Sequence, residues 1–453
     1  MPNRKPNDAL LRLVDEADWT YRQFAAAVNR VGAETGVQLR YDESGVKHWL
    51  DGTMPRKKAR PAVVEALSRR IGRPVTQEQA EFGPSPAVAE LTAETPGEPM
   101  NTVEGLVDTG RADMDPSRRK VLTSALYSAA LAVPSYDDVL GRLEHQATGR
   151  TLKIGAGEVA TVRTMTDRIA DILDELGGGH ARPMAAAFLV NTVAPYLHAD
   201  ASVAVKKDML AAASDLVYLT GWMAMYEKAH GLGQRYYLQA LELAGAAEDY
   251  VTYCRTLRGM ALQAANLKHA NKALDLADSA AEAAPNAGPR LQAFLRGQQA
   301  QGAALVGDRA LAFRRLAETE TALSKADNRR EAVGGYDQSA YLFHVSSVLY
   351  ALRDVPGSVE AMKQSNRARP PMERQGSAHA NGLLAQRQLE MGHLEAACST
   401  WSRFLDDYAS LSSERADEHF SIMRRRIRPH LANHHARELN ARSHEVARQK
   451  AAA

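Results

Sequence analysis

The sequence has few cysteines and few aromatic residues. Its only cysteines are Cys254 and Cys398, which excludes the disulfide framework of a small secreted domain and favours two packed thiols in a reducing compartment. They could form a bridge only if the fold brought them together. Aromatic residues make up 6% of the chain, whereas Ala, the strongest helix former, is abundant. We therefore expect a helix-rich architecture with little or no β-structure.

Long apolar runs are also missing. No window approaches the roughly 20 consecutive apolar residues that a membrane helix needs. The first residues, MPNRKPNDALLRLVDEADW, are charged and lack the apolar stretch of a secretory signal. These absences predict a cytoplasmic protein that has no membrane partner.

The motifs of common catalytic and cofactor sites do not occur. The sequence contains no G-x-x-x-x-G-K-[ST] phosphate loop, no H-E-x-x-H zinc motif and no pair of C-x-x-C knuckles. His434 and His435 could hold a metal ion, but a solvated helix face explains two adjacent histidines in a basic tail better. We expect no enzymatic activity, no cofactor and no metal site.

Charge is unevenly distributed along the chain. Residues 1–73 contain fourteen Lys and Arg against nine Asp and Glu, a balance of +5, which leaves −3 for the rest of a chain whose net charge is +2. A basic N-terminal domain on a mildly acidic chain is typical of a protein that binds phosphate groups through that domain, although many basic domains do not bind nucleic acid.

Composition and periodicity divide the chain into five parts and predict an all-α fold. They are 1–82, a compact helical domain; 83–116, a Pro- and Gly-rich linker; 117–200, a helical connecting region; 201–411, TPR-like repeats; and 412–453, a C-terminal capping helix and tail. Such a tail would give the last repeat the polar outer face that helical solenoids need.

The repeats are recognised by small residues where two antiparallel helices cross and by large residues in the gaps between them. The segment 217–249 fits best, with Gly221 in the first helix and Gly233, Tyr237 and Ala240 in the second. Later units are looser, and the clearest of them spans 378–404. We expect about five helix pairs.

The N-terminal domain carries clear helix boundaries. Thr20 and Gln23 form a capping box, and Asp42 or Ser44 can cap a short helix that is followed by Gly52, a residue suited to a left-handed C-terminal position. The apolar residues of this short helix predict its buried side; they are Val46, Trp49 and Leu50.

The string V46-K-H-W49-L50-D-G52-T-M-P55-R56 resembles the second motif helix of lambda-repressor-like, or XRE-type, helix-turn-helix proteins. The resemblance implies that this helix enters the major groove of double-stranded DNA. The implied base-reading residues are Glu43, Ser44, Lys47 and His48. The implied phosphate contacts are Thr53, Arg56, Lys57, Lys58 and Arg60. One departure is the connection from Val31 to Asp42, about ten residues where the family has about four.

A small helical protein-interaction domain with ordinary surface lysines and arginines is the alternative interpretation of this N-terminal part. The basic cluster 56–60 follows the short helix directly. In a domain of that kind, acidic residues would be expected among the basic ones. The cluster therefore favours DNA binding.

The order of the parts resembles the helix-turn-helix/TPR regulators of high-GC filamentous bacteria, through strings such as DLVYLTGWMAMYEKAHGLGQRYYLQALELA. Its architecture also resembles the peptide-pheromone receptors of quorum sensing. That resemblance implies transcription regulation by a homodimer whose solenoid groove holds a peptide, small-molecule or protein ligand. From the repeat register we expect the groove to be lined near Asn266, Arg296, Gln299, His344 and Asn381. The alternative is a TPR scaffold or adaptor with no direct DNA binding.

Overall fold

The computed structural model describes residues 6–34, 37–71, 75–82, 102–114, 152–284, 287–326 and 336–452. Within these ranges the chain is helical, and its only extended pairing is an isolated bridge between Lys153 and Asp200. None of the described helices is long and apolar enough to cross a bilayer. Cys254 and Cys398 are free, buried thiols. The all-α class predicted from composition is confirmed.

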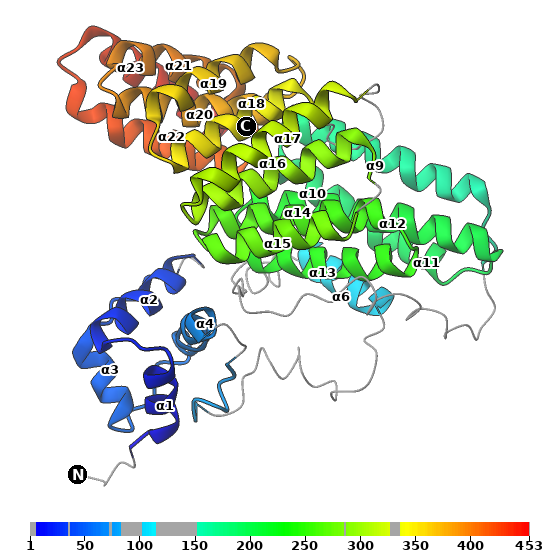
Figure 1. The fold of residues 1–453 in the computed structure, drawn as a ribbon, viewed down its shortest axis with the longest axis horizontal. Coiled ribbons are helices and arrows are strands. Elements are labelled where there is room, and N and C mark those ends of the chain that lie inside the picture. Colours follow the sequence, from blue (N-terminus) through cyan, green and yellow to red (C-terminus); the bar gives the residue numbers. More distant parts are fainter. Residues whose placement is uncertain are drawn as a thin grey trace.

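The N-terminal domain is a bundle of four helices (Figure 1). They are α1 (Asp8–Glu16), α2 (Tyr21–Glu34), α3 (Glu43–Leu50) and α4 (Arg60–Ile71). Leu10, Phe24, Val46, Trp49 and Leu67 belong to one apolar core that contains residues of this domain alone. Because it buries its own apolar faces, the bundle is a separate structural unit.

Five antiparallel helix pairs follow, as the repeat pattern predicts, and they stack in chain order into an α-solenoid (Figure 1). The pairs are α12 (Val203–Tyr226) with α13 (His230–Ala246), α14 (Tyr250–Asn266) with α15 (Ala270–Glu282), α16 (Pro289–Leu305) with α17 (Arg309–Ser324), α18 (Gln338–Ala351) with α19 (Val355–Ala368), and α20 (Arg374–Glu390) with α21 (Leu394–Tyr408). The tail forms two helices that pack on the last pair, α22 (Glu414–Ile427) on α20 and α23 (His434–Ala452) on α21.

Small residues set the crossing of α12 and α13. A Cβ atom on Gly221 would lie 2.9 Å from the Tyr237 ring and 3.2 Å from the carbonyl oxygen of Gly233. Because Gly221 and Gly233 have no Cβ, the backbones of α12 and α13 can approach closely. The fully buried Tyr237 fills the space beside them. The sequence assigned these residues to the crossing, and the structure confirms it.

Residues 83–116 were expected to be linker throughout, but Thr102–Met114 forms helix α6. Its buried Leu106 belongs to the apolar core of the solenoid. Asp113 pairs with Arg182, and Gln239 Nε2 donates to Thr109 Oγ1 over 3.1 Å. These tertiary contacts stabilise a helix whose own sequence has only a weak apolar stripe. The remaining linker positions, 83–101 and 115–116, lie outside the described residues.

The connecting region supplies helices that touch both ends of the solenoid. They are α9 (Ala156–Leu176), α10 (Gly178–Phe188), the π-helical turn η1 (Leu189–Val193) and α11 (Ala194–Leu197); positions 117–151 lie outside the described residues. Helix α9 packs on α12, in the first repeat pair, and on α20, in the last. The solenoid is therefore closed upon itself.

Main-chain hydrogen bonds join the α9–α10 junction to the segment that follows α21. Ser412 N donates to Leu176 O over 2.8 Å, and Gly179 N donates to Ser412 O over 2.9 Å. Gly178 N donates to Gln375 Oε1 over 3.2 Å. Lys228, after α12, adds an ion pair of 3.1 Å with Glu418 of α22. We call this set of contacts the closure.

Gly177 is required at the closure for two reasons. Its φ of +92° is rare for residues with a side chain, and an added Cβ would lie 2.4 Å from Ser412 O. We expect Gly177→Ala to lower the free energy of unfolding of the solenoid by about 2 kcal/mol or more. Chemical denaturation followed by circular dichroism would measure the loss.

Gly157→Ala is the matched control, because Gly157 lies in the first turn of α9 with nothing within 4 Å of an added Cβ. There the substitution should be neutral or slightly stabilising, by less than about 1 kcal/mol. Equal stabilities for the two variants would contradict the close approach of Ser412 to Gly177.

Candidate functional site

The start of α3 is fixed by its cap. Asp42 Oδ1 accepts hydrogen bonds from Gly45 N over 3.0 Å and from the Ser44 hydroxyl over 2.8 Å. These bonds favour the charged carboxylate and hold the pKa of Asp42 below its ordinary value. At the other end Gly52 adopts the left-handed conformation, with φ of +89°. Both boundaries expected from the sequence, with Asp42 rather than Ser44 as the cap, are thus observed.

The long connection between α2 and α3 is held by a side chain that sequence reasoning missed. Asn29 of α2 donates to Tyr41 O over 2.7 Å and accepts from Tyr41 N over 2.9 Å. The Tyr41 ring in turn meets the Trp49 ring edge-on, with centroids 4.7 Å apart. A single asparagine thereby satisfies both backbone groups of Tyr41 and fixes α3 against α2.

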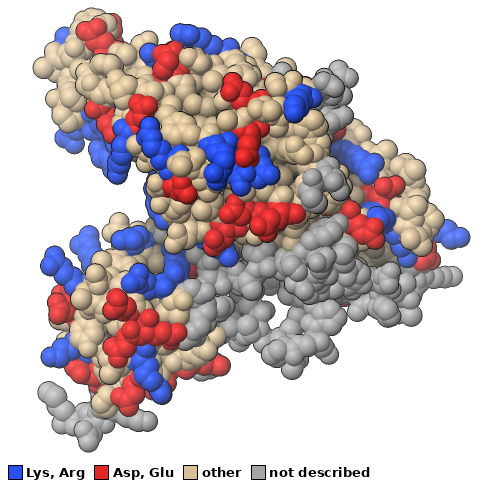
Figure 2. Space-filling model, in the orientation of Figure 1, with Lys and Arg blue, Asp and Glu red and all other residues tan. Residues whose placement is uncertain are grey.

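Helix α3 separates its buried and exposed residues as expected. Val46, Trp49 and Leu50 are buried. The four expected base-reading residues, Glu43, Ser44, Lys47 and His48, are all exposed. Figure 2 shows Lys and Arg side chains along the edge of the N-terminal domain that carries α3, with acidic side chains among them. The helix therefore offers a polar outer face on a rigid apolar base.

The five expected phosphate contacts divide into two groups. Arg56, Lys57 and Lys58 are exposed, and Thr53 is partly buried. Arg60 instead ties the domain together, since its Nε donates to Pro55 O and its Nη1 to Phe82 O, both over 3.0 Å. Its guanidinium is therefore engaged within the domain, whereas the other basic side chains face solvent.

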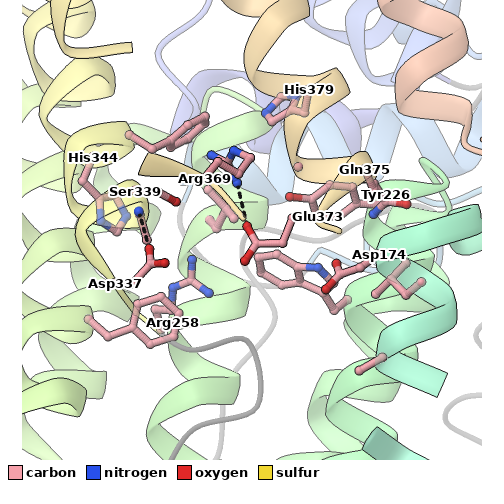
Figure 3. A pocket seen from close by; sticks show the side chains of 18 of the residues that line it. Asp174, Tyr226, Arg258, Asp337, Ser339, His344, Arg369, Glu373, Gln375 and His379 are labelled. Atoms are coloured by element: carbon pink, nitrogen blue, oxygen red, sulfur yellow. Dashed lines mark hydrogen bonds and ion pairs between the residues drawn. The ribbon is translucent and has the colours of Figure 1, made fainter. Parts of the chain in front are cut away.

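A cavity of about 410 Å³ lies inside the closed solenoid. Its walls come from α9 and from the first helix of every repeat pair, α12, α14, α16, α18 and α20 (Figure 3). Both elements that meet at the closure, α9 and α20, therefore contribute to the wall. Its size is that of a site for one small molecule, since ligand pockets measure about 300–1,000 Å³.

Aromatic side chains form one wall of this cavity. Tyr218, Trp222 and Tyr226 follow one another at four-residue steps on α12, so they share one face of the helix. Phe294 of α16 and Phe343 of α18 line the cavity from neighbouring repeats. Tyr236, Tyr237 and Trp401, in contrast, are fully buried core. Trp222 is only partly buried and lines the cavity.

Charged side chains stand among these rings. Arg369 pairs with Glu373 over 3.1 Å, and Asp337 caps α18 by accepting from Ala340 N over 3.0 Å. Asp174 faces the cavity from α9. Its burial, and secondly the negative charge of the neighbouring Glu373, raise the pKa of Asp174 to about 7. Arg258 projects from α14.

One of the five expected groove residues lines the cavity. His344 faces it, and burial lowers the pKa of His344 to about 3, so the ring is neutral and bonds Tyr336 over 2.9 Å. Gln299 bonds Asp278 of α15 over 2.6 Å, and Arg296 pairs with Glu318 of α17 over 3.3 Å, so both face the outer helices. Asn381 bonds Asn366 of α19 over 2.9 Å. Asn266 is exposed at the end of α14.

The histidine pair of the tail lies on an exposed face of α23. His434, His435 and Glu438 come within reach of one another, and His434 Nδ1 lies 3.3 Å from Glu438 Oε2. All three are exposed. The contact with Glu438 gives His434 a partner on its own helix.

We expect Asn29→Ala to loosen α3, because it leaves both backbone groups of Tyr41 without their partner. The loss of two partly buried hydrogen bonds should destabilise the N-terminal domain by about 1–3 kcal/mol. Hydrogen exchange of the full chain would report it as faster exchange over residues 37–50. Arg30→Ala, an exposed neighbour on α2, is the control; equal exchange in the two variants would contradict the role of Asn29.

Comparison with known proteins adds one finding about the N-terminal bundle. The family model described as the SP15 N-terminal domain matches residues 10–83. No curated protein matches the chain. The description names a domain and no activity. The N-terminal bundle is therefore similar to SP15 N-terminal domains.

Proposed function

We propose that the chain is a sequence-specific DNA-binding transcriptional regulator. Its solenoid would bind a signal, as a peptide, small molecule or protein partner, and would mediate homodimerisation. In this proposal α3 reads base edges in the major groove of double-stranded DNA. The basic segment after α3 holds the neighbouring phosphates.

The observation that carries the proposal is the separation of the two faces of α3. Trp49 and its apolar neighbours fix the helix on the bundle, so the exposed Lys47 and His48 are held in a defined direction. Arg56, Lys57 and Lys58 follow at once and are exposed. A polar helix face beside exposed cations is the arrangement that groove reading requires, because phosphate contacts fix the register and base contacts select the sequence.

The solenoid supports the regulatory half of the proposal. A ligand changes DNA affinity only if it binds two states of the protein unequally. The cavity is lined by both elements that meet at the closure, α9 and α20. A ligand there would therefore bind the closed solenoid more strongly than an opened one. In a dimer formed through the solenoid, a change between the closed and the opened state would alter the spacing of the two α3 helices.

DNA binding is tested in two steps. The purified full chain first captures genomic fragments, and fluorescence polarisation then measures its affinity for the most enriched site. We expect Lys47→Ala to weaken binding to that site by about 1–3 kcal/mol and to relax its sequence preference. Arg56→Ala should weaken binding equally on all sequences and lower the salt slope by about one. The double variant should not bind.

Arg12→Ala is the matched control, because Arg12 is an exposed arginine of α1 and its loss removes the same charge. Its affinity should stay within about twofold of the original, as expected for a charge remote from the contact surface. A full chain that holds no duplex even at low ionic strength would refute the regulator and leave an adaptor or scaffold built on the solenoid.

A further inference from the structure

Buried arginines in the described part of the chain have partners, with one exception. The most deeply buried arginines, each at most 6% exposed, are Arg182, Arg255, Arg258 and Arg387. Arg182 pairs with Asp113, and Arg255 pairs with Asp215 over 2.7 Å. Arg387 donates to the hydroxyls of Ser346 and Ser358 over 2.6 and 2.8 Å. Such partners are expected, because an unpaired buried charge is costly.

Arg258 is the exception. It is 6% exposed, and no described carboxylate lies within ion-pair distance of its guanidinium. Its Nε is buried without a hydrogen-bond partner, as are those of Arg182 and Arg255, but those two residues have a carboxylate at Nη1. Arg255, one helical turn earlier on α14, has a carboxylate, so the contrast arises within a single helix.

Aromatic rings hold the Arg258 guanidinium at the cavity wall. Its Cζ lies 3.8 Å from the centre of the Phe294 ring and 5.1 Å from that of Trp222. Such contacts contribute about 0.5–2 kcal/mol each, less than the cost of burying an unpaired charge. The rings therefore fix the direction of the side chain and leave its charge uncompensated.

Two acidic residues of the cavity have partners other than Arg258. Glu373 pairs with Arg369, and Asp337 accepts from the first turn of α18. Figure 3 shows Asp337 on the same side of the cavity as Arg258 and His344, and Asp174 and Glu373 on the other side. Asp337 forms no ion pair with Arg258 and accepts a hydrogen bond at the start of α18. The guanidinium can therefore pair with one further negative group, whereas Asp174 and Glu373 disfavour a second one.

We propose that the cavity binds a small organic acid with a single carboxylate, which pairs with Arg258, and a flat apolar body that packs against Trp222 and Phe343. This inference rests on the proposed function, in which the solenoid binds a signal, and specifies that signal. A guanidinium and a carboxylate form two parallel charge-assisted hydrogen bonds, which would supply the missing partner. The acids on the far side argue against phosphorylated ligands with several charges.

The probes are benzoate, phenylacetate and indole-3-acetate, each with its neutral amide, added to the full chain at concentrations up to millimolar. Isothermal titration and thermal unfolding are the two measurements. At least one acid should bind and raise the Tm, and its amide should bind at least tenfold more weakly. Arg258→Met should lose at least tenfold in affinity for the acid, whereas Arg258→Lys should retain part of it.

Unfolding without ligand separates a binding role from a structural one. Arg258→Met should keep or raise the Tm, because it removes a charge that has no partner. Arg387→Met, the matched variant at a partnered arginine, should lower the Tm. If Arg258→Met lowers it as much, or if no acid binds better than its amide, the assignment of Arg258 is overturned.

DNA binding is measured separately, so the two proposals can fail independently. An acid that binds through Arg258 in a chain that holds no DNA supports the ligand class and refutes the regulator. A chain that binds DNA but none of the acids keeps the regulator and overturns the ligand class.

Discussion

The contact between the α9–α10 junction and Ser412 is the constraint on which the solenoid depends. Two main-chain hydrogen bonds, from Ser412 N to Leu176 O and from Gly179 N to Ser412 O, join segments that are far apart in the sequence. They form only because Gly177 and Gly179 leave room for the Ser412 backbone. This closure brings α9 against α20, so that both helices line the same cavity.

The cavity wall places charged groups among aromatic rings, and the pairing of each charged group determines what it can do. Arg255 and Arg258 occupy successive turns of α14, with similar burial and similar aromatic neighbours. Asp215 compensates the first charge, while the second remains available. Burial alone therefore does not distinguish these two arginines; the absence of a carboxylate partner does, and the proposal that Arg258 binds a ligand rests on it.

The sequence predicted those features that depend on neighbours in the chain. The Asp42 cap, the left-handed Gly52 and the apolar side of α3 follow from spacings of a few residues. The five helix pairs and the Gly221–Tyr237 crossing follow from a repeated pattern. Helix α6 was missed because its stability comes from contacts with α10 and α13 rather than from its own composition.

Features that depend on contacts between distant residues could not be predicted. The close approach of Gly177 to Ser412 joins segments that are far apart in the sequence, and no local pattern indicates it. Asn29 carries no local motif that links it to Tyr41. Of the expected groove residues, His344 faces the cavity but Arg296 and Gln299 face the outer helices, because a small error in helical register moves a residue to another face.

Methylation interference on the captured DNA site tests most directly whether α3 reads the major groove. The account predicts that methyl groups at guanine N7, which project into the major groove, abolish binding by the full chain at two half-sites about 10 base pairs, or a small multiple of that, apart. Binding that tolerates N7 methylation throughout the site would contradict the account, since α3 would then not occupy the major groove.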